Sequence, residues 1–160
     1  MRVVWFLVYF AFAFVLQTII APMISIVGIS PDFILFLVVF LSLRYGAVWG
    51  VLWGFFAGFT EDIYRDVDWL GAAAMVKSSI GFIVGQLEEK FFNLGLLTRV
   101  IVLAIAFIAN DILFALIIGM DKDLVLDMFM TRTLPSGLYT MVLGTLAFNF
   151  LYSHASKPKS

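Results

Sequence analysis

Long apolar runs alternate with short polar runs along the chain, and this alternation predicts helices that cross a membrane. The second run is the shortest, since its thirteen residues rise only about 20 Å as a helix, against about 30 Å for a hydrocarbon core. We expect it to be flanked by loop buried in protein, or to lie where the bilayer is thin. Together the runs predict an all-α integral membrane protein, a compact bundle of six transmembrane helices in one domain. The six runs cover residues 3–22, 31–43, 45–62, 69–86, 99–120 and 134–152.

The polar runs are too short to form a second domain. Before the last apolar run, Asp123, Asp127 and Thr131 recur every four residues with apolar residues between them, which predicts a short helix lying in the membrane interface. With six spans, one side of the membrane receives six basic residues and the other side three. The excess of basic residues on the cytoplasmic side then places both termini in the cytoplasm, with 153–160 as a short tail.

Composition supports a membrane protein. Hydrophobic residues make up 63% of the 160 residues and charged residues only 13%, which is too little polar surface to coat a soluble domain. The first apolar run is too long for the apolar part of a signal peptide, so we interpret it as a retained span. Cysteine is absent, which excludes disulfides and thiolate metal sites, and the single His154 lies outside the apolar runs.

The third run carries a glycine at every fourth position and ends in a cluster of charges. Such a ladder leaves a groove along an apolar helix into which another helix can press. Two alternatives stay open: packing inside the bundle, or docking of a partner's transmembrane helix. The ladder consists of Gly46, Gly50, Gly54 and Gly58.

The charges at the end of this run form an acidic rim that the basic-residue count places outside the cell. We expect partner contacts there, although Asp32 has the alternative role of capping the helix that follows Pro31. The rim residues predicted to contact a partner are Asp32, Asp62, Arg65 and Asp66.

Lys77 and Asp111 are the ionisable residues that lie well inside apolar runs. Counted from the ends of their runs they have the same depth, and an unpaired charge there costs at least about 2.5–3.5 kcal/mol. We therefore predict an intramembrane polar pair, with Asn110 or Ser78 as further partners. A structural pair, a functional polar pocket and a proton or ion relay are the open interpretations.

Enzyme classes find no support in the residue pattern. An intramembrane aspartyl protease needs two embedded aspartates, whereas Asp111 alone is clearly within a run, and the position of His154 excludes a serine protease dyad in the membrane. The glycine ladder is helical and is no phosphate-binding loop. We predict no catalytic residues, no cofactor, no metal and no nucleic-acid partner.

Six short motifs, in this order and spacing, resemble the rod shape-determining MreD family over essentially the whole chain. The motifs are Gln17-Thr18, Pro22, Gly28-Ile29-Ser30-Pro31-Asp32, Leu43-Arg44-Tyr45-Gly46, Gly58-Phe59 with Asp62, and Leu70-Gly71. The resemblance implies a non-enzymatic subunit of the cell-elongation machinery in the bacterial inner membrane. It also implies a fold similar to the S components of energy-coupling-factor vitamin transporters.

The implied partner is the membrane-anchored MreC, through its transmembrane helix and juxtamembrane segment. Indirect partners are RodA, a class B penicillin-binding protein and the actin-like MreB, all in lateral peptidoglycan synthesis, with a homodimer inside the complex left open. The alternatives are an S component proper or a structural subunit of another complex. The first apolar run has no pair of alanines four apart, which counts against vitamin uptake.

Overall fold

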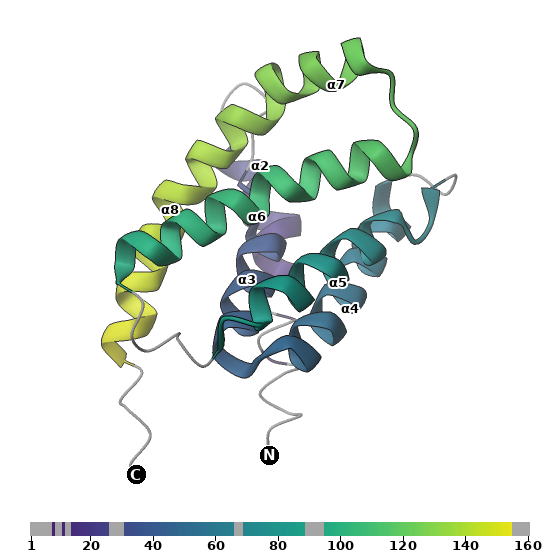
Figure 1. Ribbon diagram of the computed structural model, residues 1–160. Helices are drawn as coiled ribbons and strands as arrows, with labels where there is room; N and C mark the ends of the chain where they lie inside the picture. Colours follow the sequence, from purple (N-terminus) through teal and green to yellow (C-terminus); the bar gives the residue numbers. More distant parts are fainter. Residues whose placement is uncertain are drawn as a thin grey trace.

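The computed structural model describes residues 8, 11, 14–25, 31–65, 69–88 and 95–154, and every regular element among them is helical. The all-helical prediction is thereby confirmed. In chain order the elements are the π-helical turn η1 (Leu16–Ile20), α2 (Ala21–Met23), α3 (Phe33–Tyr45), α4 (Ala47–Arg65), α5 (Ala72–Gly85), α6 (Leu96–Ile117), α7 (Lys122–Met128), the π-helical turn η4 (Phe129–Thr133) and α8 (Leu134–His154) (Figure 1).

Helices α3, α4 and α5 pack together, and α6 and α8 complete the bundle on the other side (Figure 1). The contact between α4 and α5 is the most extensive of the fold. The last three elements of the chain, α7, η4 and α8, follow one another without a break over residues 122–154. This stretch is about 50 Å of helix at 1.5 Å per residue. The short helix expected in the interface therefore continues directly into the last expected span.

The glycine ladder of α4 is occupied by α5. A Cβ atom added at Gly50 would meet the carbonyl oxygen of Gly81, and one added at Gly54 would meet the carbonyl group of Lys77. Gly58 stands in the same relation to the backbone at Ala73. The structure therefore favours internal packing, because α5 covers the face on which a partner's transmembrane helix was expected to dock.

The remaining glycine of the ladder, Gly46, has a different structural role. Gly46 lies between α3 and α4 at a φ of 88°, a conformation that residues with a Cβ rarely adopt. Its N–H donates a hydrogen bond of 2.9 Å to the carbonyl oxygen of Ser42 and ends α3. Gly46 thus makes the reversal that sets α4 beside α3.

The short helix α3 is enclosed by the rest of the bundle. Its side chains are apolar on all sides, and Leu35, Val38 and Val39 are fully buried. A helix of this kind contacts other helices rather than lipid. This enclosure explains how a run too short to cross a bilayer unaided fits into the protein.

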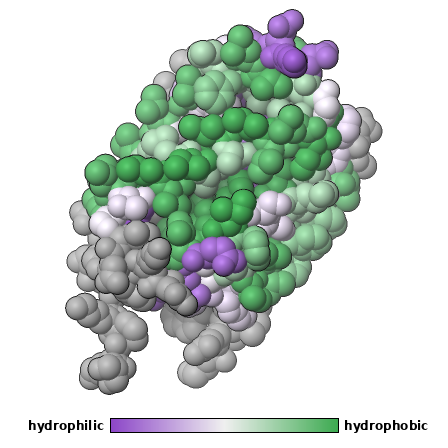
Figure 2. Space-filling model, viewed as in Figure 1, coloured by the Kyte–Doolittle hydropathy of each residue, from purple (hydrophilic) through white to green (hydrophobic). Residues whose placement is uncertain are grey.

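The outer surface is largely hydrophobic. Large apolar side chains are exposed along α4, α6 and α8, including Val48, Leu97 and Val142. Figure 2 shows one face that is almost continuously hydrophobic, with hydrophilic residues gathered at two separate places. An exposed apolar surface of this extent suits contact with lipid or with other membrane helices.

By length and composition, α6 is the helix among the described residues that could cross a membrane unaided. Helices α3 and α5 are apolar but shorter. The prediction of six crossings, with the chain ends in the cytoplasm, stays a prediction.

Candidate functional site

The centre of the site is the ammonium group of Lys77, which lies in the second turn of α5 and is 1% exposed. Its Nζ atom lies 2.9 Å from a carboxylate oxygen of Glu61 on α4 and 3.7 Å from one of Asp32 at the start of α3. It also donates a hydrogen bond of 3.3 Å to Oδ1 of Asn110 on α6. One buried cation therefore links four helices. Its ionic contacts and its hydrogen bond offset the free-energy cost of removing the ammonium group from water.

Asp111 belongs to the same cluster through its neighbour. Asn110 donates from Nδ2 to Oδ1 of Asp111 at 3.0 Å, and Thr133 of η4 donates its hydroxyl to Oδ2 at 2.6 Å. Lys77 and Asp111, predicted as a pair, thus lie in one network with Asn110 between them. The ion pairs of Lys77 are instead with Glu61 and Asp32, while Ser78 turns its hydroxyl toward backbone carbonyl oxygens.

The sequence interpretation missed Glu61 as a partner of Lys77, although α4 carried a signal for it. Glu61 follows Gly54 by seven residues and Gly58 by three, so it lies on the glycine face of the helix. Since that face packs on α5, its carboxylate is directed at α5 as well. The helix α5 also begins at Ala72 rather than near Trp69. Lys77 therefore lies closer to the start of its helix than expected.

Asp32 has the capping role that was one of its two alternatives. Its Oδ1 accepts a hydrogen bond of 2.7 Å from the N–H of Leu35 in the first turn of α3, and its own N–H donates to the hydroxyl of Thr140 on α8. The other carboxylate oxygen faces Lys77. Asp32 therefore contacts α3, α8 and Lys77 within the chain, and it also borders the cavity.

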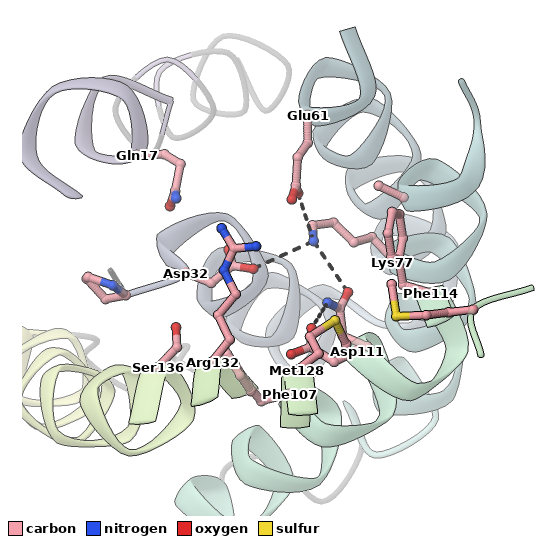
Figure 3. A pocket seen from close by; sticks show the side chains of 14 residues that line it. Gln17, Asp32, Glu61, Lys77, Phe107, Asp111, Phe114, Met128, Arg132 and Ser136 are labelled. Carbon is pink, nitrogen blue, oxygen red and sulfur yellow. Dashed lines mark hydrogen bonds and ion pairs between the residues drawn. The ribbon is translucent and has the colours of Figure 1, made fainter. Parts of the chain in front are cut away.

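These side chains surround a cavity of about 230 Å³ at the end of the bundle where α3 and α5 begin and α4 ends (Figure 3). In Figure 3, dashed lines run from Lys77 to Glu61 and to Asp32. The lining consists of Gln17, Pro31, Asp32, Glu61, Ala73, Lys77, Phe107, Asn110, Asp111, Phe114, Met120, Met128, Arg132 and Ser136.

The described residues hold no group of histidine, cysteine and carboxylate side chains that could bind a metal ion. The lining of the cavity combines ionic and hydrogen-bonding groups with aromatic and methionine side chains. Chemically, this arrangement is suited to binding.

Comparison with protein families matches residues 1–155 to the family described as rod shape-determining protein MreD. The chain belongs to the MreD family. No curated protein and no solved structure matches the chain. The family makes this a membrane protein of the system that determines rod shape.

Two of the motifs on which the resemblance was based meet in one structural feature. The side chain of Asp62, which is 4% exposed, accepts hydrogen bonds of 3.0–3.1 Å from the backbone N–H groups of Gly71, Ala73 and Ala74. Gly71 precedes α5 at a φ of 102°, which favours glycine. Asp62 therefore caps α5 from the end of α4 and points into the protein, so the outer contact expected of it is not available.

Two other motifs from that resemblance also have physical roles here. Gln17 accepts a hydrogen bond of 2.9 Å from the N–H of Phe33 at the start of α3. The guanidinium of Arg44 lies 5.4 Å from the ring centroid of Tyr45, a cation–π contact just before the turn at Gly46. Of the remaining rim residues, Asp66 lies outside the described residues, as does the side chain of Arg65.

Proposed function

We propose that this protein is a non-enzymatic membrane subunit of the bacterial cell-elongation complex that binds MreC and helps to control lateral peptidoglycan synthesis. The observation that carries the proposal is the match of residues 1–155 to the MreD family. RodA, the class B penicillin-binding protein and MreB would be reached through MreC.

The extended apolar surface supports a function in binding. The outward face of α4 exposes a row of aromatic side chains, in which the rings of Phe55 and Phe59 stack at 5.9 Å and Phe56 is 57% exposed. Aromatic side chains are enriched at interfaces between proteins. Since α5 covers the glycine face of α4, a transmembrane helix of MreC would dock on an outward face of this kind.

The cluster around Lys77 is consistent with the proposed orientation. The beginnings of α3 and α5 and the end of α4 meet at one end of the bundle, as alternating spans require. With both termini in the cytoplasm, that end faces outward, where the juxtamembrane segment of MreC lies. Arg65 and Asp66 remain the proposed contacts for that segment.

Co-purification tests the proposal. The full chain is expressed in a membrane with MreC of the same organism, extracted in mild detergent and captured by an affinity tag on one of the two proteins. We expect MreC to be retained. If MreC were lost while a vitamin and a coupling ATPase were retained, the chain would be an S component and the proposal would be overturned.

Crosslinking then locates the contact. A photoreactive residue placed at Phe56 on α4 is compared with one at Ile105 on α6 and one at Val142 on α8, all of them exposed apolar positions. A crosslink to MreC from Phe56 alone supports the aromatic face of α4. A crosslink only from Ile105 or Val142 would assign the contact to the other side of the bundle.

A further inference from the structure

The two π-helical turns among the described residues have the same position relative to a proline. The turn η1 ends two residues before Pro22, and η4 ends two residues before Pro135. Proline donates no backbone hydrogen bond, and in a regular α-helix its ring collides with the carbonyl group four residues earlier. In η4 the N–H of Leu134 donates instead to the carbonyl oxygen of Phe129, five residues back. Prolines and π bulges are the places at which long helices bend.

The turn η4 separates a packed stretch of helix from one that is not packed. After η4, Gly137 lies against the ring of Phe107, and Thr140 accepts a hydrogen bond from the N–H of Asp32. Before η4, the helix α7, all of whose residues are described, has no buried side chain, and its most extensive contact is with η4. Figure 1 shows α7 at the edge of the molecule, away from α4 and α5. A segment with so few buried contacts moves at a low cost in free energy.

The other end of α7 also has a residue that can act as a pivot. Gly119 follows α6 at a φ of 67°, with open space where a Cβ atom would stand. Hinges in proteins are a few residues at the ends of elements that absorb changes in φ and ψ. Residues 120–132, here called the arm, therefore lie between a glycine at positive φ and a π turn that precedes a proline.

The arm forms part of the wall of the cavity. Met120, Met128 and Arg132 belong to the lining. Figure 3 shows the side chain of Arg132 reaching into the cavity from η4, while Lys77 and Glu61 enter it from α5 and α4. A movement of the arm would therefore open the cavity without separating α4 from α5.

A buried hydrogen bond holds the π turn against α6. Thr133, the last residue of η4, is 2% exposed and donates its hydroxyl to Oδ2 of Asp111 at 2.6 Å. Hydrogen bonds to charged groups are stronger than those between neutral groups. This bond therefore favours the position of the arm in which the cavity is covered.

We propose that the arm is a hinged lid over the cavity at Lys77 and that the hydrogen bond from Thr133 to Asp111 is the latch that keeps the lid closed. When the lid opens, the Lys77 cluster becomes accessible from outside the bundle. The movement requires no partner, so its test is separate from the binding of MreC.

Access to an introduced cysteine tests the lid, because the chain has no cysteine of its own. Ala73 on α5 lines the cavity and is 3% exposed, whereas Ala115 on α6 is 2% exposed and lies outside the lining. The purified full chain with Ala73→Cys or Ala115→Cys is treated in detergent with a charged methanethiosulfonate reagent. Mass spectrometry measures the rate of labelling.

Thr133→Val removes the latch and should raise the rate at Ala73→Cys at least about tenfold, while the rate at Ala115→Cys stays unchanged. Thr133→Ser keeps the hydroxyl and should restore the slow rate. Thr131→Val is the matched control, because the hydroxyl of Thr131 bonds to a carbonyl oxygen within the arm. No acceleration at Ala73→Cys, or equal acceleration at both cysteines, would overturn the proposal.

Distances between spin labels give a second measurement that does not depend on Ala73→Cys. Leu126 on α7, Ile105 on α6 and Val142 on α8 are each 61% exposed. Double electron–electron resonance should give a broader distance distribution for labels at positions 126 and 105 than for labels at 105 and 142. Thr133→Val should broaden the first distribution further and leave the second unchanged. Equally narrow distributions for both pairs, with and without Thr133→Val, would show that the arm is rigid and would overturn the proposal.

Discussion

Adding a single methyl group at Gly54 should weaken the packing of α4 against α5. The Cβ atom of Gly54→Ala would overlap the backbone carbonyl of Lys77 and the backbone nitrogen of Ser78 on α5. Backbone atoms cannot rotate away as the end of a flexible side chain can. The two helices must therefore move apart along part of their most extensive contact.

The size of the effect follows from two opposing terms. Overpacking a well-packed site costs about 1–3 kcal/mol, and the upper end applies where the neighbour is backbone. Alanine regains about 1 kcal/mol over glycine inside a helix. We expect a net loss of about 2 kcal/mol in the free energy of unfolding, which is roughly a thirtyfold change in the unfolding equilibrium.

Two other glycines provide matched comparisons. Gly95 has nothing within 4 Å of an added Cβ and an ordinary φ of −62°, so Gly95→Ala should change the free energy of unfolding by less than about 0.5 kcal/mol. Gly71 also has open space but a φ of 102°, so Gly71→Ala should lose about 1–2 kcal/mol through backbone strain.

Equilibrium unfolding in mixed micelles, followed by tryptophan fluorescence, measures all three variants. The expected order of stability places Gly95→Ala nearest the wild type and Gly54→Ala lowest or level with Gly71→Ala. If Gly54→Ala were as stable as Gly95→Ala, α5 would not be pressed against the glycine face of α4. A partner's helix would then again be a candidate for that face.

Three further predictions concern the polar groups, each measured by the same unfolding assay. Asp62→Ala removes the acceptor of three backbone N–H groups and should cost about 1–2 kcal/mol, with Asp62→Asn in between; equal stability of both with the wild type would contradict the cap. Lys77→Met leaves two carboxylates without their counter-ion and should cost about 3–5 kcal/mol, and adding Glu61→Gln should restore part of it; no restoration would contradict the ion pair. Thr133→Val removes the hydroxyl that donates to Asp111 and should cost about 1–3 kcal/mol, whereas Thr131→Val, whose hydroxyl bonds its own helix, should cost less.

Helix positions could be predicted from the sequence because apolar runs and their ends are local signals. The run 31–43 corresponds to α3, Phe33–Tyr45, and its start at Asp32 is marked by a cap that is visible in the sequence. The turn at Gly46 was not predicted, because Gly46 was assigned to the glycine ladder of the next run, and its φ of 88° is seen only in the structure.

Which side chains meet could be predicted only in part. The partners of Asp62 lie nine to twelve residues further along the chain, so its capping of α5 depends on how α4 and α5 are placed together. The depth of Lys77 was counted from a helix start that is three residues too early. Its true position brings it within reach of Glu61, whose place on the glycine face of α4 was a signal that the sequence interpretation did not use.

The glycine face of α4 and the charged site are physically one arrangement. Gly54 lies against the backbone at Lys77, and Glu61 follows two turns later on the same face of α4, where it reaches the Nζ atom of Lys77 at 2.9 Å. Any substitution that separates the helices also lengthens this ion pair. The effects of Gly54→Ala and Lys77→Met should therefore not add, and a double-mutant cycle should give a coupling of about 0.5–3 kcal/mol. Strict additivity would show that packing and charge are independent here, and the close approach of the helices would then not be what positions Glu61.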